Sequence, residues 1–175
     1  MKKIIFGIVL LFSFNILCLA ADDIAPNSKS AILMEMSTGK ILYEKNSHEK
    51  LPPASMTKVM SMLLVMEAID NGIIKLTDEV QISETAASMG GSQVFLEAGE
   101  KYPVEELLKG VAIASGNDAV VALAEKVSGS VESFVEKMNQ RASELGMKDT
   151  IYKKLIQTIS ICIYINKNNL IRQYV

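Results

Sequence analysis

The segment from Ala54 to Asp70 constrains the fold most, because it is long enough for a helix and apolar on almost every side. Pro52 and Pro53 precede it, and Asn71-Gly72 supplies a typical helix end. Its apolar side chains are those of Val59, Met60, Met62, Leu63, Leu64, Val65, Met66 and Ile69. A helix of this kind belongs in the core, so the rest of the chain is expected to cover it on nearly every face.

The segments on either side of this helix predict a hairpin followed mostly by helices. Residues 30–36 and 41–45 are short apolar runs that flank a turn, in which Gly39 is free to adopt a positive φ. Pro103 fits the first turn of a later helix, with Glu105 and Glu106 near its positive end. The further helices are expected over residues 103–113, 117–127 and 130–145, the last ended by Gly146. The sequence contains no internal repeat.

The N-terminal segment has the layout of a secretory signal peptide. Two lysines precede an apolar run, and the small residues Cys18 and Ala20 favour cleavage before Ala21. A retained anchor is the alternative, although the run is shorter than the roughly 20 residues of a membrane span. We therefore expect residues 1–20 to be removed and the protein to be exported to the extracellular or cell-wall side.

The C-terminal segment differs in composition from the part before it. Residues 151–175 contain no Gly, Ala, Pro, Asp or Glu, but they contain seven Ile, three Asn, three Lys and three Tyr. These residue types share A/T-rich codons, so the segment is typical of a frame-shift or truncation after about residue 150. A genuine Ile-rich strand is the alternative. The apolar part, residues 155–165, is too short to span a bilayer, so the sequence does not support membrane attachment.

Charge and residue types exclude several classes of function. The formal net charge is −2, whereas a nucleic-acid-binding protein normally shows a basic excess. One histidine excludes a multi-histidine metal site, and Cys18 and Cys162 are too few and too far apart for a zinc cluster. The histidine, His48, lies in a polar loop and is expected on the surface, which argues against a Ser-His-Asp triad.

A serine nucleophile can use a lysine as its base, provided that the lysine is close and partly desolvated. The Ser-x-x-Lys spacing places both side chains on one helical face, but the sequence contains three such pairs. They are Ser37/Lys40, Ser47/Lys50 and Ser55/Lys58. Only the last lies at the start of the apolar helix, where Lys58 is the one cation between Ala54 and Ile69 and faces Ser61. Lys58 therefore either extends to solvent or serves catalysis.

A second polar cluster, Ala114-Ser115-Gly116-Asn117-Asp118, lies between two expected helices. Gly116 permits a tight turn that can bring the flanking side chains together. The alternative is an ordinary capping turn, with Ser115 or Asn117 as the N-cap. Taken alone, the pattern favours the capping turn.

Together the two clusters resemble a known family. The segments 53–58, Pro-Ala-Ser-Met-Thr-Lys, and 113–119, Ile-Ala-Ser-Gly-Asn-Asp-Ala, are similar to the first two motifs of the penicillin-binding serine D-Ala-D-Ala carboxypeptidases of the peptidase S11 type. The similarity covers about residues 26–150, including 35–43, 91–99 and 145–150. It implies an α+β fold of the β-lactamase/transpeptidase-like type, with an antiparallel sheet, helices and a helical subdomain. Residues 21–150 would form the N-terminal part of this domain.

The resemblance also implies a role for each matching residue. Ser55 would attack the carbonyl between the two terminal D-alanines of a peptidoglycan stem peptide, and Lys58 would take its proton. Ser115 would relay a proton to the leaving nitrogen, and Asn117 would hydrogen-bond the substrate backbone. β-Lactam antibiotics mimic this substrate and would acylate Ser55. No metal or organic cofactor is implied.

The chain departs from the family pattern in one respect. It contains no Lys-Thr-Gly or Lys-Ser-Gly triplet, which in the family binds the substrate carboxylate from an inner strand well beyond residue 150. We therefore expect the C-terminal strands of the sheet to be missing. Two alternatives stay open: a β-lactamase of the same superfamily, and an inactive secreted fragment. Ser-Gly-Asn at 115–117, in place of Ser-Asp-Asn, favours the carboxypeptidase.

Overall fold

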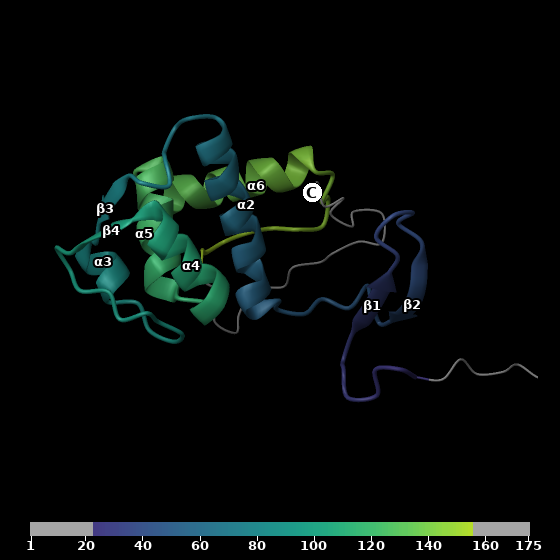
Figure 1. Ribbon diagram of the computed structural model, residues 1–175. Coiled ribbons are helices and arrows are strands. Elements are labelled where there is room, and N and C mark those ends of the chain that lie inside the picture. Colours follow the sequence, from purple (N-terminus) through teal and green to yellow (C-terminus); the bar gives the residue numbers. More distant parts are fainter. Residues whose placement is uncertain (1–22, 156–175) are drawn as a thin grey trace, which may run out of the picture.

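A β-hairpin opens the part of the chain that the computed structural model describes, residues 23–155. Strand β1 (Ala31–Met34) pairs antiparallel with β2 (Ile41–Lys45), as the sequence predicts. Gly39 in the turn has a φ of 70°, which confirms its expected role. Figure 1 shows the hairpin to the right of the helices. The expected signal peptide and residues 156–175 lie outside the described part.

The expected helices are all present, with small shifts at their ends. A short 3-10 turn, η1 (Ala54–Met56), leads into α2 (Thr57–Asp70), and Ser130 caps the last helix by accepting from the N–H of Ser133. The later helices are α4 (Val104–Ala114), α5 (Asn117–Ser128) and α6 (Val131–Glu144). Three short elements were not expected: β3 (Glu79–Gln81), β4 (Lys101–Pro103) and α3 (Glu84–Ala87). They are too short to produce a periodic pattern. β3 pairs antiparallel with β4.

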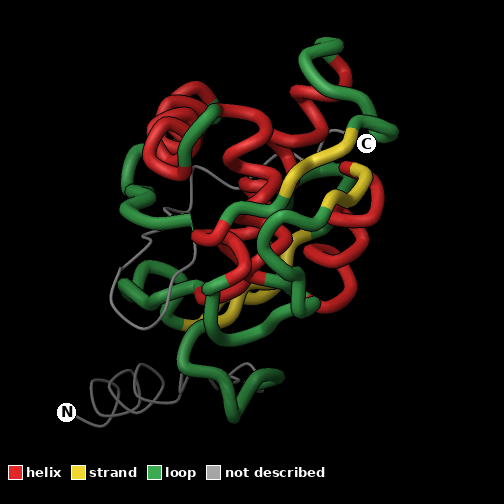
Figure 2. Tube along the Cα trace, turned by 90° about the vertical axis from the view of Figure 1, so that its left-hand side faces the viewer, coloured by secondary structure: helices red, strands yellow, loops and turns green. Residues whose placement is uncertain are grey.

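The core forms around α5. Each residue from Asn117 to Ala124 in this helix is buried, and α5 packs against α2, α3, α4 and α6. The view turned by 90° also shows the helices packed together (Figure 2). Phe134 and Met138 add the buried face of α6. The central position of α5 matters for the site, because its first residues belong to the second polar cluster of the sequence.

The core extends past residue 150. Tyr152 and Leu155 are buried, and burial raises the pKa of Tyr152 to about 12. The Asn139 side chain binds the Tyr152 backbone twice: its Nδ2 donates to the carbonyl oxygen at 2.7 Å, and its Oδ1 accepts from the N–H at 2.8 Å. The expected domain boundary at residue 150 stays a prediction, but the first residues beyond it pack against α6.

The apolar helix α2 is buried on only part of its surface. Met60 and Val65 face the core and are 2% and 1% exposed, whereas Val59 and Met66 are 49% and 45% exposed. The expectation of burial on nearly every face is therefore wrong for the described part of the chain. Helices α4, α5 and α6 pack against α2, but within residues 23–155 about half of the Val59 and Met66 side chains stays exposed.

Two methionines on α2 test this asymmetry. Met60→Ala should lower the free energy of unfolding by about 2–5 kcal/mol, because it leaves a cavity in the core. Met66→Ala should change it by less than about 1 kcal/mol, because nearly half of that side chain is already in water. Urea titrations followed by circular dichroism would measure both values. Equal losses for the two variants would contradict the described packing.

Candidate active site

Lys58 brings the two polar clusters of the sequence together. Its Nζ lies 3.4 Å from Oγ of Ser55, one turn away, and 3.2 Å from Oγ of Ser115, which follows α4. The lysine is only 4% exposed, so the alternative in which it extends to solvent is wrong. The structure therefore places three of the four predicted site residues in one hydrogen-bonded group.

The backbone holds both serines in specific turns. Ser55 lies exposed in η1, directly before the first turn of α2 that carries Lys58. Ala54, just before it, has a φ of 49°, and Ser115 has a φ of 55°. Left-handed conformations cost residues other than glycine about 1–3 kcal/mol each, and they persist only where the surroundings enforce them. Both turns of the site thus carry local strain.

The surroundings of Lys58 favour a neutral amine. Burial lowers the pKa of Lys58, because desolvation penalises the charged form. Within residues 23–155 its side chain forms hydrogen bonds with two neutral hydroxyls, and no carboxylate forms an ion pair with it. A neutral lysine amine next to a serine hydroxyl can accept the proton of that hydroxyl and so generate a nucleophile.

Ser115 and Asn117 form a turn, but neither side chain caps α5. Ser115 ends α4 in the left-handed region, and Gly116 takes the N-cap position of α5 without a side-chain bond. The capping interpretation of this cluster is therefore wrong. Asn117 instead binds a neighbouring loop: its Nδ2 donates to the carbonyl of Gly90 at 2.6 Å, and its N–H donates to that of Ser92 at 2.7 Å. The role of Asn117 toward a substrate stays a prediction.

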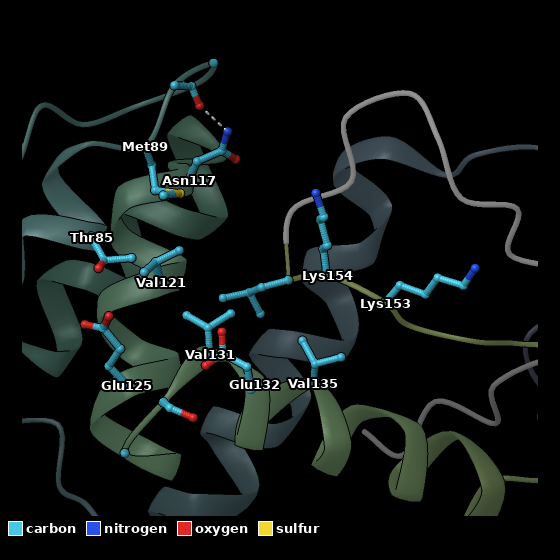
Figure 3. A pocket seen from close by; sticks show the side chains of 15 residues that line it. Thr85, Met89, Asn117, Val121, Glu125, Val131, Glu132, Val135, Lys153 and Lys154 are labelled. Atoms are coloured by element: carbon cyan, nitrogen blue, oxygen red, sulfur yellow. Dashed lines mark hydrogen bonds between the residues drawn. The ribbon is translucent and has the colours of Figure 1, made fainter.

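A cavity of about 970 Å³ begins beside Asn117. It lies between α3, α5, α6 and the segment 153–155, and Figure 3 shows Asn117 at one end with its bond to the loop. The cavity lining combines apolar side chains such as Val121 and Val135 with the charged Glu125. Ser55, Lys58 and Ser115 do not line it. Asn117 is thus the only predicted site residue that reaches this cavity in the described structure.

The other candidates of the sequence lie away from this group. Ser47 donates a hydrogen bond to Glu44, and His48 is exposed with Nε2 at 3.5 Å from the same carboxylate, which confirms its surface position. Ser61, which the helical spacing places near Lys58, is fully buried, but its Oγ has no hydrogen-bond partner in the described part of the chain. Residues 23–155 hold no group of three or more His, Cys, Asp or Glu suited to a metal ion. In the same range, no helix is both long and apolar enough to cross a membrane.

Asp118 belongs to this site, although the sequence analysis gave it no role. It is 1% exposed, and its carboxylate accepts hydrogen bonds from the N–H groups of Val94, Leu96 and Ala119. One signal was present in the sequence. An acidic residue directly before the apolar run 119–124 cannot be solvated if that run is buried, so it needs partners within the protein.

Comparison with known proteins identifies the family of this chain. The model of the Peptidase S11 family, described as D-alanyl-D-alanine carboxypeptidase, matches residues 19–156. D-alanyl-D-alanine carboxypeptidase DacF of Bacillus subtilis is 63% identical over 132 residues, which cover 75% of this chain and 34% of that protein. The crystal structure of D-alanyl-D-alanine carboxypeptidase DacD from Francisella tularensis matches with a TM-score of 0.76 and 34% identity, over 81% of this chain and 35% of that one. Penicillin binding protein 5 from Haemophilus influenzae has the same TM-score and identity, over 80% and 42%.

These similarities confirm the α+β, transpeptidase-like fold that the two motifs imply. The chain spans about a third to two-fifths of the length of the relatives named here. The family match itself covers most of this chain, including both clusters that meet at Lys58. The chain therefore belongs to the Peptidase S11 family of D-alanyl-D-alanine carboxypeptidases.

Proposed function

We propose that this chain carries the nucleophile and the general base of a serine D-Ala-D-Ala carboxypeptidase that acts on peptidoglycan stem peptides. One observation carries the proposal: the buried Lys58 amine lies within hydrogen-bond distance of both Ser55 and Ser115. Family membership supports the carboxypeptidase over a β-lactamase, because the matching family model and the named relatives carry that description.

The proposed reaction has two steps. Neutral Lys58 takes the proton of Ser55 as Oγ forms a bond to the carbonyl carbon between the two D-alanines, and the N–H of Ser55 stabilises the resulting oxyanion. The C–N bond then breaks, and the leaving nitrogen receives a proton from Ser115, which Lys58 reprotonates across 3.2 Å. Water then hydrolyses the ester on Ser55 and releases the shortened peptide. A β-lactam would enter the first step through its strained amide and leave an acylated Ser55.

Export of the protein fits this substrate, because peptidoglycan lies outside the cytoplasm. We propose that residues 1–20 direct export, on the basis of the basic start, the apolar run and the small residues before Ala21.

Mass spectrometry of the protein recovered from expressing bacteria tests this export. The mature chain should begin at Ala21, because Cys18 and Ala20 present small side chains at the −3 and −1 positions. Ala20→Trp should block the cut, whereas Lys29→Ala, beyond the signal, should leave it unchanged. Recovery of the wild-type chain with its N-terminal segment intact would favour the retained anchor.

Labelling with a fluorescent penicillin tests the nucleophile. The chain should be joined to the part of the Bacillus subtilis relative that lies beyond the match, because its own sequence lacks the Lys-Thr-Gly motif. The label should attach to Ser55, and Ser55→Ala should abolish it. Ser37→Ala and Ser47→Ala remove the serines of the other two Ser-x-x-Lys pairs and should label normally. Labelling that persists in Ser55→Ala would refute the assignment.

The same hybrid tests Lys58 as the base. Lys58→Arg keeps a cation but cannot supply a neutral amine near pH 7, so the acylation rate should fall by about 10²–10⁴-fold. In the unmodified hybrid the rate should rise with pH and level off above the pKa of Lys58, which burial places below its usual value. Stopped-flow acylation over a pH series would measure both effects. Normal acylation with Arg at position 58 would exclude Lys58 as the base.

A further inference from the structure

The carboxylate of Asp118 lies at the centre of a hydrogen-bond network that the proposed chemistry does not use. Its Oδ1 accepts from the N–H of Val94 at 3.1 Å and from its neighbour Ala119 at 2.9 Å, and its Oδ2 accepts from Val94 at 3.0 Å and from Leu96 at 3.1 Å. Within residues 23–155 no basic side chain forms an ion pair with it. Its charge is thus balanced by backbone dipoles, and such charge-assisted bonds are stronger than neutral ones.

The backbone at Phe95 is shaped to receive this carboxylate. Phe95 has a φ of 60° and is 81% exposed, which is an unusual combination for a bulky residue. A left-handed residue turns the N–H groups on either side of it toward one point, forming a concave site for an anion. The N–H groups of Val94 and Leu96 both meet Asp118 in this way. The anion thus accounts for a strained conformation that no burial of the Phe95 ring explains.

The neighbouring Asn117 extends the contact along the same loop. Asn117 binds the carbonyls of Gly90 and Ser92, and Asp118 binds the N–H groups at 94 and 96. Every second residue of the loop is therefore fixed to the start of α5. The fit is close, because a Cβ on Gly91 would lie 2.8 Å from Nδ2 of Asn117.

The same carboxylate lies against the turn that carries Ser115. A Cβ on Gly116 would lie 2.9 Å from Oδ1 of Asp118, so the carboxylate folds back over the Gly116 backbone. The Gly116 N–H in turn donates to the carbonyl of Gly110 at the end of α4. Ser115, in its left-handed conformation, thus lies between α4 and the Gly116 backbone, which the Asp118 carboxylate and the bond to Gly110 hold in place.

We propose that Asp118 is a positioning residue, which holds the loop 90–96 on the start of α5 and thereby fixes Ser115 beside Lys58. The importance of that pair for catalysis rests on the function proposed above, but the positioning itself does not. Within residues 23–155 the Asp118 carboxylate forms its hydrogen bonds with backbone N–H groups and none with Ser55 or Lys58.

Nuclear magnetic resonance on the full 175-residue chain tests the proposal. Asp118→Asn keeps the shape of the side chain but replaces one acceptor oxygen with a donor. Amide hydrogen exchange at Val94 and Leu96 should accelerate about 10- to 100-fold, the effect of losing buried hydrogen bonds of this kind. The Lys58 amine should also titrate at a higher pH than in the wild type, because release of Ser115 admits water to the site.

Two further variants separate positioning from a general loss of stability. Gly116→Ala retains Asp118 but displaces its Oδ1. It should therefore also accelerate amide exchange at Val94 and Leu96 and raise the pH at which Lys58 titrates. Met138→Ala removes a fully buried side chain from α6, outside the loop, and should lower stability without altering the Lys58 titration.

Unchanged exchange at Val94 and Leu96 in Asp118→Asn would overturn the proposal. Faster exchange with an unchanged Lys58 titration would overturn its link to Ser115, and so would an equal shift in Met138→Ala. These readouts do not depend on penicillin labelling. A wild-type hybrid that fails to label would count against the proposed function alone.

Discussion

The desolvation of one amine is the constraint on which the rest of the site depends. Lys58 is 4% exposed, and within the described residues its Nζ forms hydrogen bonds only with hydroxyl groups. A charged ammonium in such a place loses hydration without gaining an anion, so burial lowers the pKa of Lys58. The burial of Lys58 at the start of the apolar helix α2 thus supports its proposed role as the base.

A neutral lysine is useful only if both hydroxyls stay beside it, and the fold enforces this through α5. The first eight residues of this helix are buried and packed on all sides, so the turn before it starts from a rigid element. The strained conformation at Ser115, directly before this helix, is sustained by that rigidity. The loop 90–96, bound to Asn117 and Asp118, adds a second support at the start of α5. The site is therefore built from turns that are held in place by a stable helix.

The sequence was sufficient for the parts of the structure that leave a local signal. Proline, glycine and apolar spacing located the hairpin and four helices, and the resemblance of the two motifs located Ser55, Lys58 and Ser115. The β3–β4 pair is too short for a periodic signal, and the uncovered side of α2 depends on which elements pack against it. The contact between Asp118 and Leu96 joins positions 22 residues apart, and no local pattern encodes it. The capping interpretation failed for a related reason: the polar side chains at the start of α5 bind a distant loop instead of their own helix.

The charge of the site also limits what this part of the protein can recognise. A base must be neutral before it accepts a proton, so in the reaction proposed above Lys58 works in a state in which it cannot pair with the carboxylate of a D-alanine terminus. Asn117 is an amide, and the serines are neutral. For the stem-peptide substrate proposed above, recognition of the terminal carboxylate therefore requires a second cation that is distinct from Lys58. Proton transfer and carboxylate binding are in this way separate tasks with opposite demands on charge, and the cluster around Lys58 is suited to the first of them.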